Sequence, residues 1–246
     1  MTFGQLYIPI AAAYAAAFLL HLGKKRRPAL WALLTAFSLH AVFLAVRSLS
    51  FGFFNSGAIL EEQVFLPFSL AGIGLWLRSS RREEDAAAVS VVAAVVALLA
   101  LPIDKGVIPP SPKSVSPLVP VFFFCEILAH ALFIAAAALA VRRARGQASL
   151  PQAHRFAVWG FVLFSAAQVS GAAWCYLGWS VPFQWGFRHL HSAAVWCFFA
   201  NYIHLRFLPW WNDRRKAAYL AAGALLLAAY LAVLQFIEAG QVRIGG

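Results

Sequence analysis

The sequence predicts an all-α fold: a polytopic membrane bundle of about eight transmembrane helices, with both termini outside. Hydrophobic residues make up 62% of the 246 residues and charged residues only 12%, which leaves too little polar surface to cover a water-soluble domain. The mean hydropathy is +0.74. Apolar runs of about 20 residues, long enough to cross a bilayer, recur along the whole chain.

The expected spans follow one another between basic segments and loops with few basic residues. The first, third, fifth and seventh apolar runs lead to a basic segment, and the second, fourth, sixth and eighth lead away from one. The first run ends at KKRR and has no small-residue cleavage site, so we do not expect a signal peptide. The third run is short and contains Pro67. The spans are expected at residues 6–22, 29–49, 62–77, 86–102, 118–140, 156–177, 189–205 and 217–236.

Basic residues gather in alternate loops, and this predicts the orientation. Fifteen of the 20 lysines and arginines lie there and mark the cytoplasmic side. Both termini are therefore expected outside, with outer loops near residues 50–61, 103–117 and 178–188. The net charge of +11 reflects this topology, and we expect no nucleic-acid partner. The fifteen are Lys24, Lys25, Arg26, Arg27, Arg78, Arg81, Arg82, Arg142, Arg143, Arg145, Arg155, Arg206, Arg214, Arg215 and Lys216.

Residues 1–246 are expected to form a single domain, because the sequence has neither a Gly/Ser-rich linker nor a repeat of fixed period. Cys125, Cys175 and Cys197 lie in or at the ends of spans without a CxxC pair, so we expect them to pack and not to carry out thiol redox chemistry or hold zinc. The sequence also has no GxxxxGK[ST], GxSxG or HExxH pattern. Nucleotide hydrolysis and the common hydrolytic mechanisms therefore have no support.

A tryptophan-rich stretch reads GAAWCYLGWSVPFQWGFRHLHSAAVWCFFANYIHLR. It resembles the WWD region of the cytochrome c biogenesis family (CcsA/ResC-like proteins and their CcmC- and HemX-type relatives), in which a WGxxWxWD core precedes a span that ends in YxH. The spacing matches without a gap, although Phe183 stands in place of a core Trp and Gly186 in place of the Asp. His189 and His191 stand where the family usually has Glu and Trp. The matching residues are Gly171, Trp174, Trp179, Trp185, Trp196, Ala200, Tyr202, His204 and Arg206.

A second segment, PLVPVFFFCEILAH at residues 117–130, resembles the family's PLVPxLxSxWLxxH, again without a gap. In the family this histidine is an outward-side axial ligand of haem, so the resemblance implies that role for His130. The family carries a second outward histidine after the WWD region. The final residues LAVLQFIEAGQVRIGG contain no histidine that could correspond to it.

The residue types around this region suit haem. Haem is a flat apolar disc with two anionic propionates and an iron that takes histidine nitrogens, so a membrane site needs aromatic, imidazole and cationic groups together. The expected outer loop supplies Trp179, Phe183 and Trp185 as an aromatic platform. Arg188 could pair bidentately with a propionate. Tryptophans also gather at membrane interfaces as anchoring belts, and this alternative stays open for Trp179 and Trp185.

The histidines allow more than one interpretation. Glu126 and His130 lie four residues apart on one helical face, where the carboxylate could orient the ring or the pair could fasten two helices together. The resemblance implies that His204 is an inner-site haem ligand near the cytoplasmic side, but its side chain could equally extend to the interface. His189 lies beside the tryptophan loop and could replace a missing ligand or be an interfacial polar group. His40 is expected to pack or hydrogen-bond against a neighbouring helix.

Together these observations predict a multi-pass protein of the bacterial inner (plasma) membrane that serves cytochrome c maturation by binding or delivering haem on the outer, periplasmic face. The expected partners are apocytochrome c or another cytochrome c assembly membrane protein, and the lipid bilayer. The alternative is a non-catalytic membrane-anchor or scaffold subunit that kept the fold; a small-solute permease ranks third, because no paired inverted repeats are visible. An active protein would be a haem-handling or synthetase-type assembly factor. The expected cofactor is haem b, with metal ligands His130 and His204 and surrounding residues Trp179, Phe183, Trp185, Arg188, Glu126 and His189.

Overall fold

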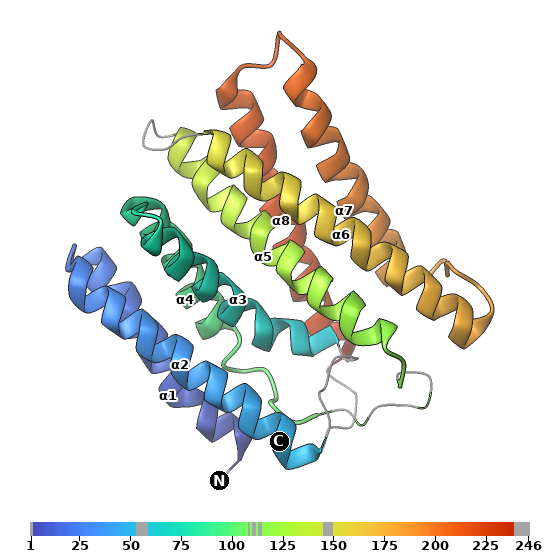
Figure 1. Cartoon of the computed structure of the whole chain (residues 1–246), viewed down its shortest axis with the longest axis horizontal. Helices are drawn as coiled ribbons and strands as arrows, with labels where there is room; N and C mark the ends of the chain where they lie inside the picture. Colours follow the sequence, from blue (N-terminus) through green and yellow to red (C-terminus); the bar gives the residue numbers. More distant parts are fainter. Residues whose placement is uncertain are drawn as a thin grey trace. The chain divides into compact units, whose positions relative to one another are not determined.

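The computed structural model describes residues 2–52, 59–107, 109, 112, 115–144 and 150–238, and over these residues the chain forms eight α-helices and no strand (Figure 1). The predicted all-α class is confirmed. Each expected span lies within one helix, except that the fourth and seventh expected spans run slightly past their helices. The helices are α1 (Phe3–Leu22), α2 (Arg26–Phe51), α3 (Ile59–Ser79), α4 (Glu83–Leu99), α5 (Leu118–Ala144), α6 (Leu150–Trp179), α7 (Phe187–His204) and α8 (Asp213–Glu238), with a short 3₁₀ turn η2 (Leu205–Phe207) after α7.

The side-chain distribution is that of a membrane protein. Over the described residues, α1, α2, α5 and α6 are long and apolar enough to cross a bilayer. Large apolar side chains are exposed, for example Leu49 at 82% and Leu177 at 73%, whereas Glu61 is fully buried. Exposed apolar side chains of this kind suit contact with lipid tails, which are as apolar as leucine. That all eight helices cross the bilayer, and that both termini lie outside, stay predictions.

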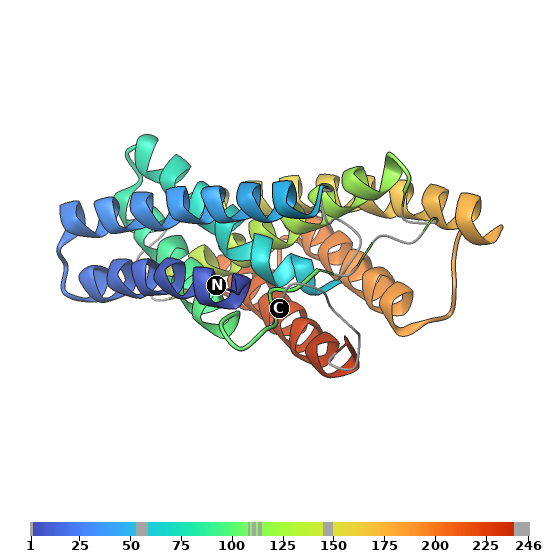
Figure 2. The same ribbon diagram turned by 90° about the horizontal axis from the view of Figure 1, so that it is seen from below.

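Contacts group the chain into two compact units, one comprising Met1–Pro110 with Gln235–Gly246 and the other Ser111–Leu234. The single-domain expectation stays a prediction. In the first unit, α1 and α2 run side by side in both views, and α4 packs against α1 and α3 (Figures 1 and 2). A capping box starts α1, because the Gln5 N–H donates to Thr2 Oγ1 and the Thr2 N–H donates to Gln5 Oε1. Gly52 ends α2 with φ +69°, a left-handed conformation that favours glycine.

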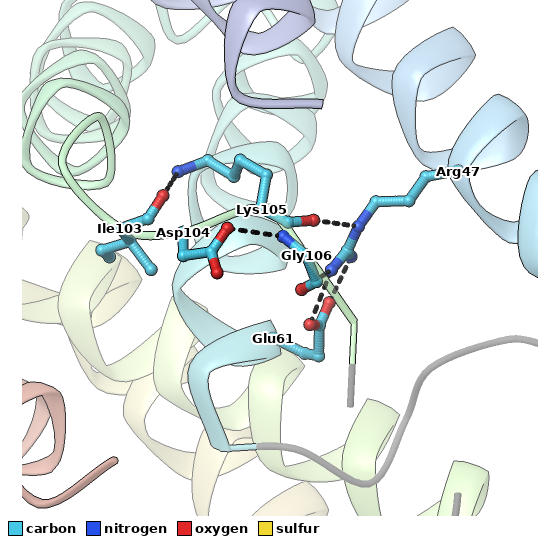
Figure 3. Close-up of polar contacts among 6 residues, drawn as sticks. All are labelled: Arg47, Glu61, Ile103, Asp104, Lys105 and Gly106. Atoms are coloured by element: carbon cyan, nitrogen blue, oxygen red, sulfur yellow. Dashed lines mark hydrogen bonds and ion pairs between the residues drawn. The ribbon is translucent and has the colours of Figure 1, made fainter. Parts of the chain in front are cut away.

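A buried ion pair holds the interior of the first unit together. The Arg47 guanidinium on α2 forms a bidentate pair with the Glu61 carboxylate on α3 (Figure 3). The same guanidinium donates to the carbonyl oxygens of Lys105 and Gly106, each at 2.9 Å. The pair therefore fastens the segment after α4 to both α2 and α3. Both charged side chains are buried, with Arg47 4% and Glu61 0% exposed.

The Lys105 side chain completes this network, although only 1% of it is exposed. Its ammonium group donates to the carbonyl oxygens of Ala100 and Ile103, which follow the end of α4 (Figure 3 draws the bond to Ile103). It also lies 4.5 Å from the centroid of the Tyr7 ring, a cation–π distance. A cation near the last carbonyls of a helix is favourable, so Lys105 stabilises the end of α4.

Three further contacts join helices of the first unit. His40 is fully buried on α2, and its Nδ1 lies 3.3 Å from the Tyr14 hydroxyl on α1, which confirms the expected contact with a neighbouring helix. At the basic end, the Glu83 carboxylate of α4 pairs with Arg78 at 2.6 Å and with Arg26 at 3.0 Å. Hydrogen bonds from these two guanidinium groups hold the pKa of Glu83 below its usual range.

In the second unit, α5 and α6 run as a long antiparallel pair in both views (Figures 1 and 2). Their contact is close at Gly160, where a Cβ atom would lie 2.8 Å from the Phe133 ring. The Phe133 ring stacks on Phe199 of α7. The Trp196 indole on α7 donates to Ser165 Oγ on α6 at 3.0 Å. This hydrogen bond joins α6 to α7.

Candidate functional site

A cavity of about 400 Å³ lies at the C-terminal end of α6, entirely within the second unit. Its walls come from the first turns of α5, the last turns of α6, the connecting loop and the start of α7. Aromatic rings, one guanidinium, one imidazole and one thiol line it together. The lining residues are Phe122, Gln168, Gly171, Ala172, Trp174, Cys175, Trp179, Pro182, Phe183, Gln184, Arg188, His189 and Ser192.

The cavity contains part of the predicted aromatic platform. Trp179 and Phe183 line it, and Trp174 packs edge-on against Trp179 with ring centroids 5.6 Å apart. Trp185 packs edge-on against Phe183 at 5.4 Å, but its side chain is 84% exposed and it is not among the lining residues. Trp185 therefore suits an interfacial contact or a partner better than the cavity wall.

Arg188 lies on the first turn of α7, at the edge of the cavity. Its Nη2 atom is 3.4 Å from Glu126 Oε2 on α5, and its guanidinium carbon is 5.1 Å from the centroid of the Phe122 ring. Glu126 is only 6% exposed. A carboxylate in an apolar interior is costly unless it is paired, so the contact with Arg188 explains how this position tolerates one. In the structure, the Glu126 carboxylate on α5 therefore contacts the Arg188 guanidinium on α7.

Gly171 gives the cavity its shape on the α6 side. A Cβ atom at this position would lie 2.9 Å from Phe122 Cδ2, closer than real Cβ contacts. Glycine therefore allows the Phe122 ring, which also contacts the Arg188 guanidinium, to approach α6 closely. This is a physical reason for glycine at a position that matches the tryptophan-rich motif.

His189 and Cys175 meet in the cavity wall. Cys175 Sγ on α6 lies 3.6 Å from His189 Nε2 on α7, and the His189 ring packs edge-on against Phe183 at 5.3 Å. The position of His189 beside the tryptophan loop is as expected. The sequence interpretation missed Cys175 and Phe122 as lining residues. The available signal was the helical spacing of Gln168, Gly171 and Cys175, which places them on one face of α6.

His130 lies deeper in the second unit. It is 1% exposed, its ring centroid is 5.5 Å from that of Phe164, and it is not among the residues that line the cavity. Along α5 it is eight residues beyond Phe122, or roughly 12 Å. His191 on α7 stacks on Tyr230 of α8 with ring centroids 3.3 Å apart. Its Nε2 atom is buried with no hydrogen-bond partner among the described residues.

His204 lies at the opposite end of α7 from the aromatic cavity. It is exposed, and its Nδ1 atom lies 2.7 Å from the carbonyl oxygen of Ala200. The fold therefore separates the two histidines that the resemblance implies as iron ligands. Within the described ranges, no group of three or more His, Cys, Asp or Glu side chains could hold a metal ion. Haem iron needs only one or two imidazoles, so the cavity still has the groups that haem requires.

Comparisons with known proteins find similarity over part of the chain. No protein-family model matches the sequence. The chain is 35% identical over 75 residues to the cytochrome c biogenesis protein CcsA of Prochlorococcus marinus strain MIT 9215, and 33% identical over 75 residues to that of strain MIT 9312. Each match covers 30% of this chain and 24% of the relative. The CcsA of strain MIT 9303 is 31% identical over 68 residues, which are 28% of this chain and 21% of the relative.

The chain thus matches about a quarter of the length of these curated relatives. The predicted resemblance to the cytochrome c biogenesis family is confirmed at this level: over somewhat less than a third of its length, the chain is similar to CcsA proteins.

Proposed function

We propose that this protein takes part in cytochrome c maturation by binding haem b at the aromatic cavity and presenting it on the outer face of a bacterial plasma membrane. The observation that carries the proposal is the single cavity in which Trp179 and Phe183 lie with Arg188 and His189. Apolar rings suit the faces of a porphyrin, a guanidinium suits a propionate, and an imidazole suits the iron. The partial similarity to CcsA proteins supports the same role.

Each residue would have one task. Trp174, Trp179 and Phe183 would form the apolar wall that contacts the porphyrin. Arg188 would bind a propionate, and this requires it to exchange its contact with Glu126 for the ligand carboxylate. The Glu126 carboxylate would then hold the guanidinium in place when no ligand is present. Bound haem would supply an iron centre for transfer to an apocytochrome c or to another assembly protein of the membrane.

Two histidines are candidates for the outer iron ligand. His130 has the spacing of the family's axial ligand, whereas His189 lines the cavity directly. His204 would serve a separate inner site, because α7 places it at the other end of the second unit. An exposed imidazole there can pair with a histidine of a partner polypeptide. The two outer candidates are distinguishable by experiment.

Haem content tests the proposal. Protein purified gently from a haem-replete host is expected to show a Soret band and a b-type pyridine haemochrome spectrum, because histidine holds haem without thioether bonds. His189→Ala and His130→Ala should each lower the haem content, and added imidazole should restore part of the spectrum of the variant that lost an axial ligand. His40→Ala is the matched control, since this buried histidine lies in the first unit and contacts Tyr14.

A folded wild-type protein that stays haem-free when haem is supplied would overturn the proposal. If that protein co-purifies stably with another membrane subunit, the scaffold alternative takes its place. One feature favours that alternative: the N-cap of α7 is Gly186, which has no side chain, at the position where the family motif has its Asp.

A further inference from the structure

We propose that a second cavity, at the N-terminal end of α6, binds the phosphate of an anionic phospholipid headgroup. This cavity has a volume of about 360 Å³ and belongs to the second unit. It is lined by Leu150, Pro151, His154, Arg155, Tyr202, Arg206, Asp213 and Lys216. Neither the haem proposal nor the similarity to CcsA proteins assigns it a ligand.

The charge of the lining favours an anion. Arg155 of α6, Arg206 of η2 and Lys216 of α8 contribute three cations, and Asp213 contributes one carboxylate, which gives a formal charge of 3 − 1 = +2 with His154 neutral. Because the three cations come from three different elements, the fold and not a run of sequence brings them together. Guanidinium groups bind phosphate oxygens bidentately, and the lysine ammonium adds a point charge.

Buried side chains as well as exposed charged ones line the cavity. Tyr202 is 3% exposed and Leu150 is 8% exposed, so both are part of the packed interior. The His154 ring lies 5.8 Å from the Tyr202 ring. Both α6 and α8 begin at this cavity, at Leu150 and Asp213, and the positive ends of their dipoles add to its attraction for an anion.

The position of the cavity along α6 matches the depth of lipid headgroups. α6 is one of the helices long and apolar enough to cross a bilayer, and Arg155 lies roughly 36 Å along it from Trp179. The segment between α7 and α8 exposes Phe207 at 73% and Trp210 at 66%. Exposed aromatic side chains beside basic ones are typical of the membrane interface. Basic pockets between transmembrane helices on the cytoplasmic side are suited to anionic headgroups.

Lipid binding is tested with the full chain in nanodiscs. Wild-type protein in nanodiscs of equal parts phosphatidylglycerol and phosphatidylcholine should be thermally more stable than in phosphatidylcholine alone, and mass spectrometry of protein released from the mixed discs should detect retained phosphatidylglycerol. The triple variant Arg155→Gln, Arg206→Gln, Lys216→Gln should bind phosphatidylglycerol more weakly by about fivefold for each charge removed, or on the order of a hundredfold in all.

The matched control removes three other exposed basic residues, in the variant Arg27→Gln, Arg214→Gln, Arg215→Gln. This control should retain the lipid; an equal loss in both variants would show diffuse charge attraction and overturn the site. If the triple variant does not fold, Arg206→Lys serves instead, because it keeps the charge and should lower retention only by the loss of bidentate contact. A second experiment adds inorganic phosphate to the detergent-purified protein. If phosphate stabilises the protein and phosphatidylglycerol does not, the ligand is free phosphate and the lipid proposal is wrong. Haem held at the aromatic cavity should stay unchanged in the triple variant, because none of the three residues lines that cavity, so this outcome is separate from that of the haem proposal.

Discussion

Replacing Arg47 with methionine is expected to destabilise the protein by about 3–5 kcal/mol, the usual effect of removing one partner of a buried ion pair. The magnitude follows from what the substitution leaves behind. Arg47 makes two hydrogen bonds to the Glu61 carboxylate and one each to the carbonyl oxygens of Lys105 and Gly106. Glu61 is fully buried, so its carboxylate would lose its guanidinium partner without access to water.

A double-mutant cycle isolates this effect. Glu61→Leu alone leaves the Arg47 guanidinium with its two carbonyl acceptors but without its counter-charge. The combination of Arg47→Met and Glu61→Leu removes both charges and is expected to be more stable than Arg47→Met alone by about 2 kcal/mol. It should not reach the wild-type stability, because the carbonyl oxygens of Lys105 and Gly106 still lose their donor at a cost of about 1–3 kcal/mol each.

Reversible unfolding by SDS in mixed micelles, followed by circular dichroism, measures these free energies. Arg27→Met is the control, because Arg27 is an exposed arginine on the same helix and its replacement should change the stability by less than about 0.5 kcal/mol. The reasoning is wrong if Arg47→Met falls within about 1 kcal/mol of the wild type, or if the two substitutions are simply additive.

Three other predictions concern orientation and the aromatic cavity. Single cysteines in a cysteine-free background should be labelled from outside at positions 110 and 182 but not at position 146, because the basic loops are expected on the cytoplasmic side. Positions 110 and 146 lie outside the described residues. The reverse labelling pattern would overturn the orientation. Trp179→Leu should lower haem content more than Trp185→Leu, at equal protein yield, because only Trp179 lines the cavity; a matching loss of protein would indicate a folding role instead. Gly171→Ala should cost about 1–3 kcal/mol and lower haem content, since its Cβ atom would displace the Phe122 ring, whereas Gly186→Ala should do neither because nothing lies within 4 Å of that Cβ atom. Equal haem content in these two alanine variants would contradict the role given to the Phe122 ring.

Periodicity and composition alone predicted the helices of this protein. The apolar runs between charged segments place the ends of each helix to within six residues. They do so because a backbone in a bilayer must satisfy its own hydrogen bonds, and a helix does this locally. The ungapped spacing from Trp174 to His204 likewise indicated which part of the chain forms the site. Of the residues predicted for the haem site, Trp179, Phe183, Arg188 and His189 line one cavity, whereas Trp185, Glu126, His130 and His204 do not, and their role in binding haem stays a prediction.

Only the tertiary structure decided which side chains meet across helices. The pairs Arg47 with Glu61, Arg188 with Glu126, and Cys175 with His189 each join different helices. Their pairing depends on how each helix is rotated about its axis. Where nearly every position is apolar and lipid is as apolar as the interior, the sequence pattern does not mark the inward face. For the same reason the sequence did not reveal that His130 is buried away from the lining of the aromatic cavity, or that Arg155, Arg206 and Lys216 converge at the opposite end of α6.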